Sequence, residues 1–142
     1  MASTMHLDVV SAEEEIFSGE VEFVVARATE GELGIMPRHA PLLARLQPGE
    51  VRVRLSGDEE QYFYVSGGMI EVQPKVVTIL ADTAARAKDL DEAAAEEAKK
   101  RAEEAIRNRT GEMDYARAQT ELAAAAAQLR AIQSLRKKRG KK

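Results

Sequence analysis

KDLDEAAAEEAKKRAEEAIRN, residues 88–108, is the stretch that decides how this 142-residue chain is organised. It contains neither Gly nor Pro, and it is rich in Ala, Glu, Lys and Arg, which have high intrinsic helix propensity. We expect one helix here, with Asp89 as its N-cap and Glu92 completing a capping-box-like pattern. The sequence before this stretch contains Gly and Pro at short intervals, so we do not expect long helices there.

A second helix is expected after the break NRTG (108–111), in which Gly111 suits a helix end or turn. The sequence MDYARAQTELAAAAAQLRAIQSLRKKR (113–139) predicts this helix, with Asp114 as its N-cap. The expected apolar stripes of the two helices comprise Leu90, Ala93, Ala94, Ala98, Ala102, Ala105 and Ile106 in the first, and Leu122, Ala126, Leu129, Ile132 and Leu135 in the second. Most of these side chains are methyl groups, each worth at most about 0.8 kcal/mol when buried. The hairpin therefore either detaches readily from its neighbour or is an ordinary two-helix appendage.

Residues 1–86 read as short β-strands separated by turns. Apolar residues alternate in 5–10 (Met5, Leu7 and Val9) and in 51–55 (Val51, Val53 and Leu55), so these positions should face a core. Further strands are expected at 21–28, 33–36, 61–66, 69–73 and 76–81, whereas 13–19 is expected to end in a turn. Strands this short and this closely spaced predict a β-sandwich or a small barrel over residues 1–86, followed by the helical hairpin over 87–142.

The net charge of −3 conceals a strongly basic end. Residues 1–88 carry a net −6 and residues 89–129 a net −4, whereas residues 130–142 carry +7 and no acidic residue. A basic end on an acidic protein suggests an acidic partner surface. The alternative is that these cations complement the negative end of the helix dipole and are otherwise a solvated tail.

We find no constellation that would support catalysis. There is no Cys, which excludes disulfides, thiol catalysis and Cys-ligated metal. His6 and His39 lie far apart in the sequence without a second cluster of ligands, so we expect one on a strand surface, one in a loop, and no metal site. There is no P-loop and no nucleophile elbow, and the sequence SGG at 66–68 is expected to be a hairpin turn. No apolar run is long enough to span a bilayer, and no signal peptide is evident.

Four segments occur in the order and spacing of one known family: HLDVVSAEEEIFSG (6–19), GELGIMPRHAPLL (31–43), YVSGGMIEVQPKVVTILADTA (64–84) and DLDEA (89–93). They resemble the epsilon subunit of the bacterial F-type ATP synthase over nearly the whole chain. The resemblance implies an α+β protein in two parts, an N-terminal β-sandwich of short antiparallel strands and a C-terminal antiparallel two-helix hairpin. It further implies a non-catalytic rotor part of the central stalk, which couples the gamma subunit to the c-ring and restrains ATP hydrolysis. Such a subunit lies on the cytoplasmic face of the bacterial inner membrane without inserting into it.

The resemblance also implies which residues meet each partner. Contact with the c-ring is expected from Glu30, Gly31, Glu32 and Leu33, and contact with gamma from Arg38, His39, Ala40, Pro41 and Leu42. The hairpin is expected to reach the alpha/beta catalytic head, where Arg130, Arg136, Lys137, Lys138 and Arg139 would approach an acidic loop of the beta subunit.

The chain departs from the family at a nucleotide motif. Some members bind ATP through [IL]-D-x-x-R-A at the start of the first helix, and the matching residues here are Leu90, Asp91, Glu92, Ala93, Ala94 and Ala95. Ala94 stands where the motif has arginine, so the guanidinium fork that would pair with a phosphate is missing. We therefore expect no cofactor and weak or no ATP binding.

Two other classes of function remain as alternatives. One is a stand-alone β-sandwich binding module with a helical oligomerisation arm, for which a lack of affinity for a gamma subunit would be evidence. The other is a nucleic-acid binder that uses the basic tail. The acidic body disfavours the second, and only 4% of residues are aromatic, none of them interleaved with the tail.

Overall fold

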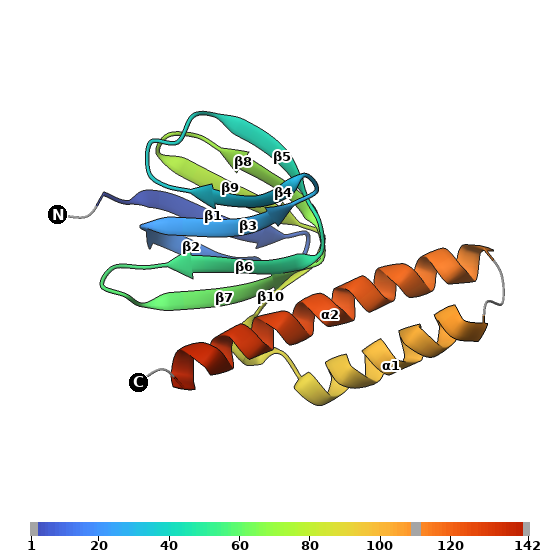
Figure 1. Cartoon of the computed structure of the whole chain (residues 1–142). Helices are drawn as coiled ribbons and strands as arrows, with labels where there is room; N and C mark the ends of the chain where they lie inside the picture. Colours follow the sequence, from blue (N-terminus) through green and yellow to red (C-terminus); the bar gives the residue numbers. More distant parts are fainter. Residues whose placement is uncertain (1–2, 109–111, 141–142) are drawn as a thin grey trace.

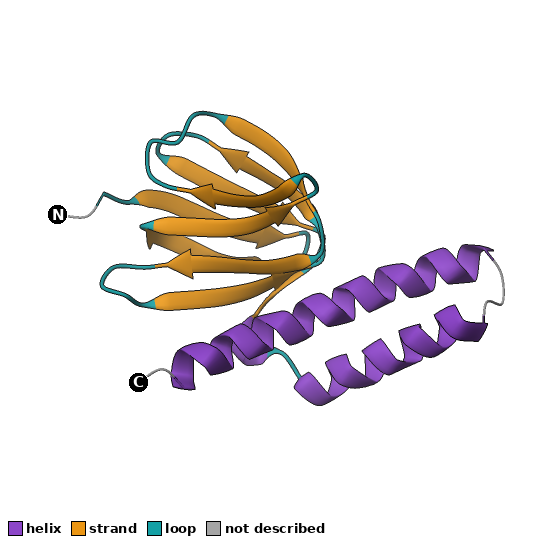
Figure 2. Cartoon of the chain, viewed as in Figure 1, coloured by secondary structure: helices purple, strands orange, loops and turns teal. Residues whose placement is uncertain are grey.

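The computed structural model describes residues 3–108 and 112–140, and of residues 112–114 and 138–140 it describes the backbone alone. Figure 1 shows a β-sandwich with a helical hairpin packed along one side, and Figure 2 separates the strands from the helices by colour. The strands are β1 (Met5–Ser11), β2 (Glu15–Val21), β3 (Phe23–Ala28), β4 (Gly31–Ile35), β5 (Leu42–Leu46), β6 (Gly49–Arg54), β7 (Glu60–Val65), β8 (Gly68–Val72), β9 (Val76–Ala81) and β10 (Ala84–Arg86). The helices are α1 (Glu92–Asn108) and α2 (Glu112–Gly140).

The strands form one hydrogen-bonded path that folds over into two layers. The order is β10-β7-β6-β3-β5-β8-β9-β1-β2, and β4 pairs with the other side of β3. The fold-over lies between β3 and β5, which share a single residue pair, Ala28 with Leu46. Neighbours are antiparallel except for β1 and β9, which run parallel. The predicted β-sandwich with its two-helix hairpin is therefore confirmed.

The core lies between the two layers and is made of alternate residues of facing strands. Met5, Leu7 and Val9 of β1 are buried, as are Val51 and Val53 of β6, which confirms the alternation read from the sequence. The rings of Phe17 and Phe63 meet edge to face across the core, with their centroids 5.6 Å apart. Edge-to-face pairs add to the stabilisation that burial alone provides.

Three strands differ from the sequence-based expectation, and one of them is β5 (Leu42–Leu46), in a stretch where the sequence predicts no strand. The segment 13–19 does not simply end in a turn, because β2 begins at Glu15 and pairs antiparallel with β1 through Val21. Only Glu22 separates β2 from β3, so the corner between them contains no Gly or Pro to mark it. The three-residue β10 was likewise not expected, and it is held by β7. β10 gains its order from a partner distant in sequence, whereas β2 forms a hairpin with the strand directly before it.

Both predicted N-caps of the hairpin are wrong. Asp89 ends a short 3-10 turn (Ala87–Asp89), and α1 begins only at Glu92. Asp91 is the N-cap, because its carboxylate accepts a hydrogen bond from the Ala94 N–H at 3.2 Å, which satisfies one of the free amides of the first turn. α2 begins at Glu112, so Asp114 lies within its first turn and not at its N-cap.

The buried faces of the helices match the predicted stripes in part. In α1 the expected Ala102 is buried and the expected Leu90, Ala98, Ala105 and Ile106 are partly buried, whereas the expected Ala93 and Ala94 are exposed and Ala95 is buried instead. α2 buries two rows of residues: Ala127 and Ala131 in one, and Ala118, Ala125 and Ile132, seven residues apart, in the other. Two rows are expected of a helix that packs on α1 and also on the sandwich. Of the predicted second stripe, only Ile132 is fully buried; Leu122, Ala126, Leu129 and Leu135 are partly buried.

Candidate functional surfaces

The turn between β3 and β4 carries the residues expected at the c-ring. Glu30, Gly31 and Glu32 are exposed and Leu33 is partly buried. Gly31 has φ 137°, a conformation that L residues with a side chain rarely adopt, so glycine is what permits this turn. The turn and the start of β5 border a groove of about 420 Å³. Among the described residues, neither carboxylate has a hydrogen-bond or ion-pair partner, so both are available to a polar partner.

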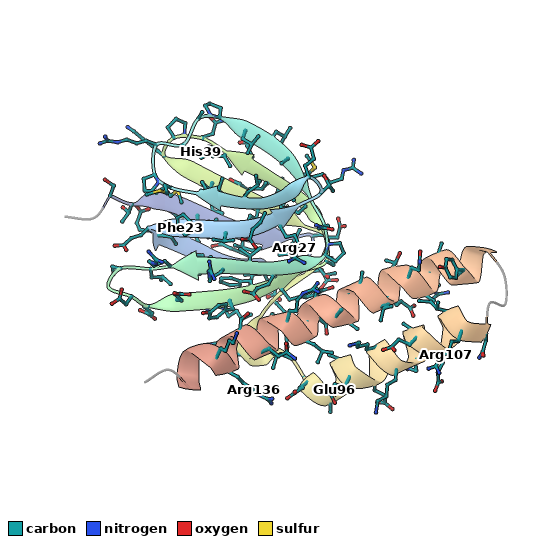
Figure 3. All side chains as sticks on the ribbon, viewed as in Figure 1. Phe23, Arg27, His39, Glu96, Arg107 and Arg136 are labelled. Atoms are coloured by element: carbon teal, nitrogen blue, oxygen red, sulfur yellow. The ribbon has the colours of Figure 1, made fainter. Side chains whose placement is uncertain are left out.

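The segment expected at gamma, Arg38 to Leu42, connects β4 to β5. Arg38 has φ 68°, and its N–H donates to the Pro74 carbonyl at 2.9 Å, which fastens this connection to the β8–β9 turn. His39 is partly buried and its Nδ1 donates to the Ala40 carbonyl at 2.7 Å. Leu42 of this segment borders the same groove as Glu30 to Leu33, so the two predicted contact surfaces adjoin there, whereas Arg38 to Pro41 do not line the groove (Figure 3 labels His39).

A third surface, not found from the sequence, is the contact between α2 and the outer face of the sandwich. It centres on five buried residues, Tyr62 and Tyr64 of β7 together with Ala87, Ala127 and Ala131. β7 is buried on both faces, since Phe63 and Val65 point into the core while the two tyrosines meet α2. We call this cluster the docking interface. Apart from the two tyrosines its buried members are alanines, and the partly buried Leu90, Ala124 and Leu135 pack against them, so α2 contributes one leucine and otherwise methyl groups.

Burial raises the pKa values of the two tyrosines. The Tyr64 pKa is raised chiefly by desolvation, and the Tyr62 pKa is raised to about 12, first by desolvation and then by the hydrogen bond that its hydroxyl donates to Glu60 at 2.9 Å. Both hydroxyls are neutral at physiological pH, as an unperturbed tyrosine also is.

Two polar contacts fasten the C-terminal half of α2. The Ser134 hydroxyl donates to the Glu50 carboxylate on β6, and Arg136 pairs with Glu92 at the start of α1. Arg136 is one of the five cations expected to act on the beta subunit. Arg130, Arg136 and Lys137 are exposed, and the side chains of Lys138 and Arg139 lie outside the described residues.

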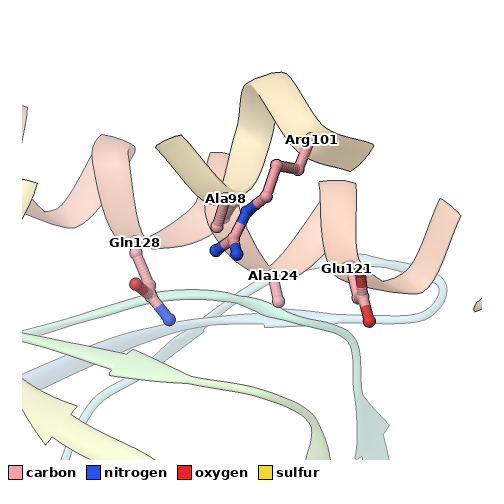
Figure 4. A pocket seen from close by; sticks show the side chains of 6 residues that line it. Ala98, Arg101, Glu121, Ala124 and Gln128 are labelled. Carbon is pink, nitrogen blue, oxygen red and sulfur yellow. The ribbon is translucent and has the colours of Figure 1, made fainter. Parts of the chain in front are cut away.

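Residues of the degenerate nucleotide motif pack and cap the start of the hairpin. Leu90 packs against the docking interface, Asp91 caps α1, Ala94 is exposed and Ala95 is buried. A groove of about 380 Å³ lies between the two helices beyond the motif (Figure 4). Its lining comprises Ala98, Arg101, Glu121, Ala124, Ala125 and Gln128. Arg101 is the one cation in that lining and it shares the groove with Glu121, so the groove offers no excess positive charge.

A polar cluster around His6 was missed by the sequence reading. On the exposed face of β1 and β2, the His6 ring lies 3.1 Å from Glu20 through Nδ1 and 3.0 Å from Asp8 through Nε2. The Ser18 hydroxyl donates to Asp8 at 2.7 Å, which is the main cause of the lowered pKa of Asp8. The hydrogen bonds to Asp8 and Glu20 raise the pKa of His6. No group of three or more metal-ligating side chains suited to a metal ion occurs in the described part of the chain.

These features define a class: a two-part protein that combines a β-sandwich with exposed loops and a helical hairpin docked on it mainly through small side chains. Comparison with known proteins identifies that class. Residues 4–87 match the family model described as the ATP synthase Delta/Epsilon chain beta-sandwich domain, and residues 88–133 match the corresponding long alpha-helix domain. The chain belongs to the ATP synthase Delta/Epsilon family.

Similar proteins show which member of the family this chain resembles. The ATP synthase epsilon chain of Nitrosococcus oceani is 65% identical over 140 residues, covering 99% of this chain and 100% of the relative. The ATP synthase epsilon chain 1 of Methylococcus capsulatus is 63% identical over 139 residues, covering 98% and 99%. The resemblance read from the sequence is thus confirmed, and the chain is a non-catalytic ATP synthase subunit of the bacterial epsilon type, with a role in ATP synthesis and proton transport.

Solved structures share the fold. A chain of the Euglena gracilis mitochondrial ATP synthase (OSCP/F1/c-ring) has a TM-score of 0.80 at 22% identity, covering 87% of this chain and 78% of that one. A chain of the Tetrahymena thermophila mitochondrial ATP synthase central stalk and c-ring has a TM-score of 0.61 at 14% identity, covering 92% and 97%. None of the helices described here is long and apolar enough to cross a membrane.

Proposed function

We propose that this chain is a reversible brake on the central stalk of a proton-translocating ATP synthase. The sandwich would anchor it to gamma and to the c-ring, at the cytoplasmic face of the bacterial inner membrane. The hairpin would inhibit ATP hydrolysis after leaving the sandwich and extending towards the alpha/beta head. The observation that carries this proposal is the docking interface, in which α2 meets two tyrosines mainly through Ala127 and Ala131. On the α2 side undocking exposes chiefly methyl groups, together with the partly buried Leu135, and each methyl group contributes little burial energy.

The charges of α2 support the same proposal. Arg136 pairs with Glu92 in the docked hairpin, and Arg130 and Lys137 are exposed beside it. In our proposal Arg136 exchanges the Glu92 carboxylate for an acidic loop of the beta subunit, together with Arg130, Lys137, Lys138 and Arg139. An exposed ion pair is worth little, so the exchange costs little.

The anchoring surfaces are proposed on the exposed loops. Glu30, Gly31, Glu32 and Leu33 would meet the c-ring, because two unpartnered carboxylates on a glycine turn suit a polar partner. Arg38, His39, Ala40, Pro41 and Leu42 would meet gamma, and the exposed neighbours Met36 (61%) and Leu43 (65%) supply apolar area for that contact. The mitochondrial assemblies described as containing a c-ring, which share this fold, support such a location.

An ATPase assay on a catalytic core stripped of its epsilon subunit tests the proposal. Three proteins would be added back: the full chain, a chain ending at Lys88, and a full chain with Arg130, Arg136, Lys137, Lys138 and Arg139 changed to Gln. We expect all three to bind and only the unmodified full chain to inhibit strongly. Unchanged inhibition by the Gln variant would refute the electrostatic role of the tail, and failure of every form to bind would refute the anchoring role.

We also propose that the hairpin does not bind ATP with useful affinity. The groove between the helices holds Arg101 as its one cation, and Ala94 leaves the motif without its guanidinium. Calorimetric titration with ATP should give no submillimolar binding to the native chain. The Ala94→Arg variant, which restores the motif, should bind more tightly, whereas the exposed Ala93→Arg variant should not. Submillimolar binding by the native chain would contradict the proposal.

A further inference from the structure

A small depression between the sandwich and α2 gathers three arginine side chains from three elements. Arg27 comes from β3, Arg52 from β6 and Arg130 from α2, and the depression has a volume of about 80 Å³. Val25, which is only 9% exposed, also borders it, and so do Glu32 and Glu50. The three arginines are far apart in sequence, so the folded and docked chain is what brings them together.

None of these guanidinium groups forms a hydrogen bond or ion pair with a described residue, although the charge of Arg52 acts on the Tyr62 hydroxyl and partly offsets the rise in the pKa of Tyr62 that burial causes. Several other arginines are engaged: Arg54 lies over the Phe23 ring at 5.7 Å, Arg86 donates to the Ile16 carbonyl at 2.9 Å, and Arg136 pairs with Glu92. By contrast, Arg27, Arg52 and Arg130 form no ion pair within 4.0 Å, although two carboxylates border the same depression. Three unpaired guanidinium groups around one small space are an incomplete electrostatic arrangement that an anion would complete.

The backbone positions this cluster. Val25 is the register partner of Arg52, and Arg27 is the partner of Glu32, so the lining residues are neighbours on three adjacent strands. The aliphatic stem of Arg27 passes over Gly49, where a Cβ would lie 3.3 Å from the Arg27 Cβ. Glycine at position 49 therefore leaves room for the Arg27 stem. Of the two carboxylates, Glu50 already accepts a hydrogen bond from Ser134.

We propose that Arg27, Arg52 and Arg130 form a binding site for one phosphate group. The guanidinium fork matches the geometry of phosphate oxygens, and three cations against two carboxylates leave one positive charge in excess. The volume is far below the roughly 300–1,000 Å³ of sites for drug-sized ligands, so the site takes inorganic phosphate or the phosphate of a small monoester. It is distinct from the groove between α1 and α2, which none of these arginines borders.

Phosphate at this site would hold the hairpin in its docked position. Arg27 and Arg52 belong to the sandwich and Arg130 belongs to α2, so one bound anion bridges the two parts of the chain. A ligand that binds only the docked form shifts the equilibrium towards it. The site concerns the isolated subunit and does not depend on the inhibitory role proposed above.

Amide chemical shifts of the full chain, followed while chloride is replaced by inorganic phosphate at constant ionic strength, test the site. We expect saturable shifts on β3, β6 and α2, and dissociation constants at least about tenfold weaker in Arg27→Gln and Arg130→Gln, since each removes a charge-assisted hydrogen bond. Arg107→Gln, an exposed arginine of α1 distant from Arg27 in Figure 3, is the matched control and should bind as the native chain does.

Two further measurements separate the site from general charge screening. Glycerol phosphate in place of inorganic phosphate would shift the same amides if a monoester is accepted. Phosphate should slow amide hydrogen exchange in α2 of the native chain and leave it unchanged in Arg130→Gln. Shifts that do not saturate, equal weakening in Arg107→Gln, or native affinity in Arg27→Gln would overturn the proposal.

Discussion

Among the described glycines of the sandwich, Gly68 has the least room for a side chain. It is the last residue of the SGG segment (66–68), which joins β7 to β8 and is not the expected hairpin turn, because these two strands do not pair. Gly68 has φ 133°, and a Cβ there would lie 2.0 Å from the Leu80 carbonyl oxygen and 2.8 Å from the Ala81 Cα. Both obstacles are backbone of the paired strand β9, which cannot move without breaking the ladder. Gly68→Ala should therefore lower the free energy of unfolding by at least about 3 kcal/mol, measured by urea denaturation.

Gly57→Ala is the matched control for that prediction. Gly57 also has positive φ, 66°, but nothing lies within 4 Å of its added Cβ. It should lose only the roughly 1–2 kcal/mol that a left-handed backbone costs a residue with a side chain. Equal losses in the two variants would show that backbone conformation, and not the close approach of β9, decides the effect at Gly68.

The His6 cluster should make the pairing of β1 and β2 depend on pH. The folded-state pKa of His6 is raised, so its stabilising contribution is complete below its usual pKa of 6.5 and is lost as pH rises through the folded value. The pKa of Asp8 is lowered from 3.8, so its contribution is complete above that value and is lost as pH falls below it. The cluster therefore stabilises most between about pH 4 and 6.5.

Thermal unfolding between pH 5 and 8 measures this contribution. His6→Gln should lower the unfolding temperature at pH 5.5 more than at pH 8, because only the protonated ring attracts both carboxylates. His39→Gln, a histidine in a loop away from the cluster, should give no such difference. A pH-independent effect of His6→Gln would contradict the assigned role of its charge.

At the scale of elements, the alternation of apolar residues correctly predicted strands that have one buried and one solvated face. The alternation of β1 and β6 was read correctly because one face of each is buried and the other is solvated. β7 is different: its outer face is covered by α2, so Tyr62 and Tyr64 are buried beside Phe63 and Val65. That covering depends on contacts between residues more than 60 positions apart, which no local pattern encodes. The His6 cluster escaped the sequence reading for the same reason, since it depends on the register of β2 against β1.

The start of α1 gives a prediction at this scale. Asp91 caps the helix through the Ala94 N–H, whereas Asp89 belongs to the preceding 3-10 turn. Asp91→Ala should destabilise α1 by about 1 kcal/mol, seen as faster amide hydrogen exchange in its first two turns. Asp89→Ala should leave that exchange nearly unchanged. If Asp89→Ala had the larger effect, the sequence-based choice of cap would be restored.

At the scale of the whole molecule, the sequence predicted two parts and a thinly packed hairpin, but not which surface of the sandwich receives it. The partners of Ala127 and Ala131 are two tyrosines whose positions in β7 read as an ordinary strand. Alanine is a strong helix former whether it is buried or exposed, so its presence does not indicate a binding face. Docking is consequently a property of the assembled chain, and a substitution in α2 can remove it while both parts stay folded.

Ala131→Glu should produce that separation. Ala131 is fully buried in the docking interface, so a carboxylate there would be a buried, unpaired charge beside Tyr62 and Tyr64. Ala123→Glu, at an exposed position of the same helix, is the matched control. We expect limited proteolysis to cleave α2 much faster in Ala131→Glu only, while amide exchange in β1 and β9 stays slow in both.

In the add-back ATPase assay, Ala131→Glu should inhibit more strongly than the native chain, because the docked hairpin no longer competes with the extended one. Weaker inhibition together with a released hairpin would instead mean that the buried face of α2 also contacts the catalytic head.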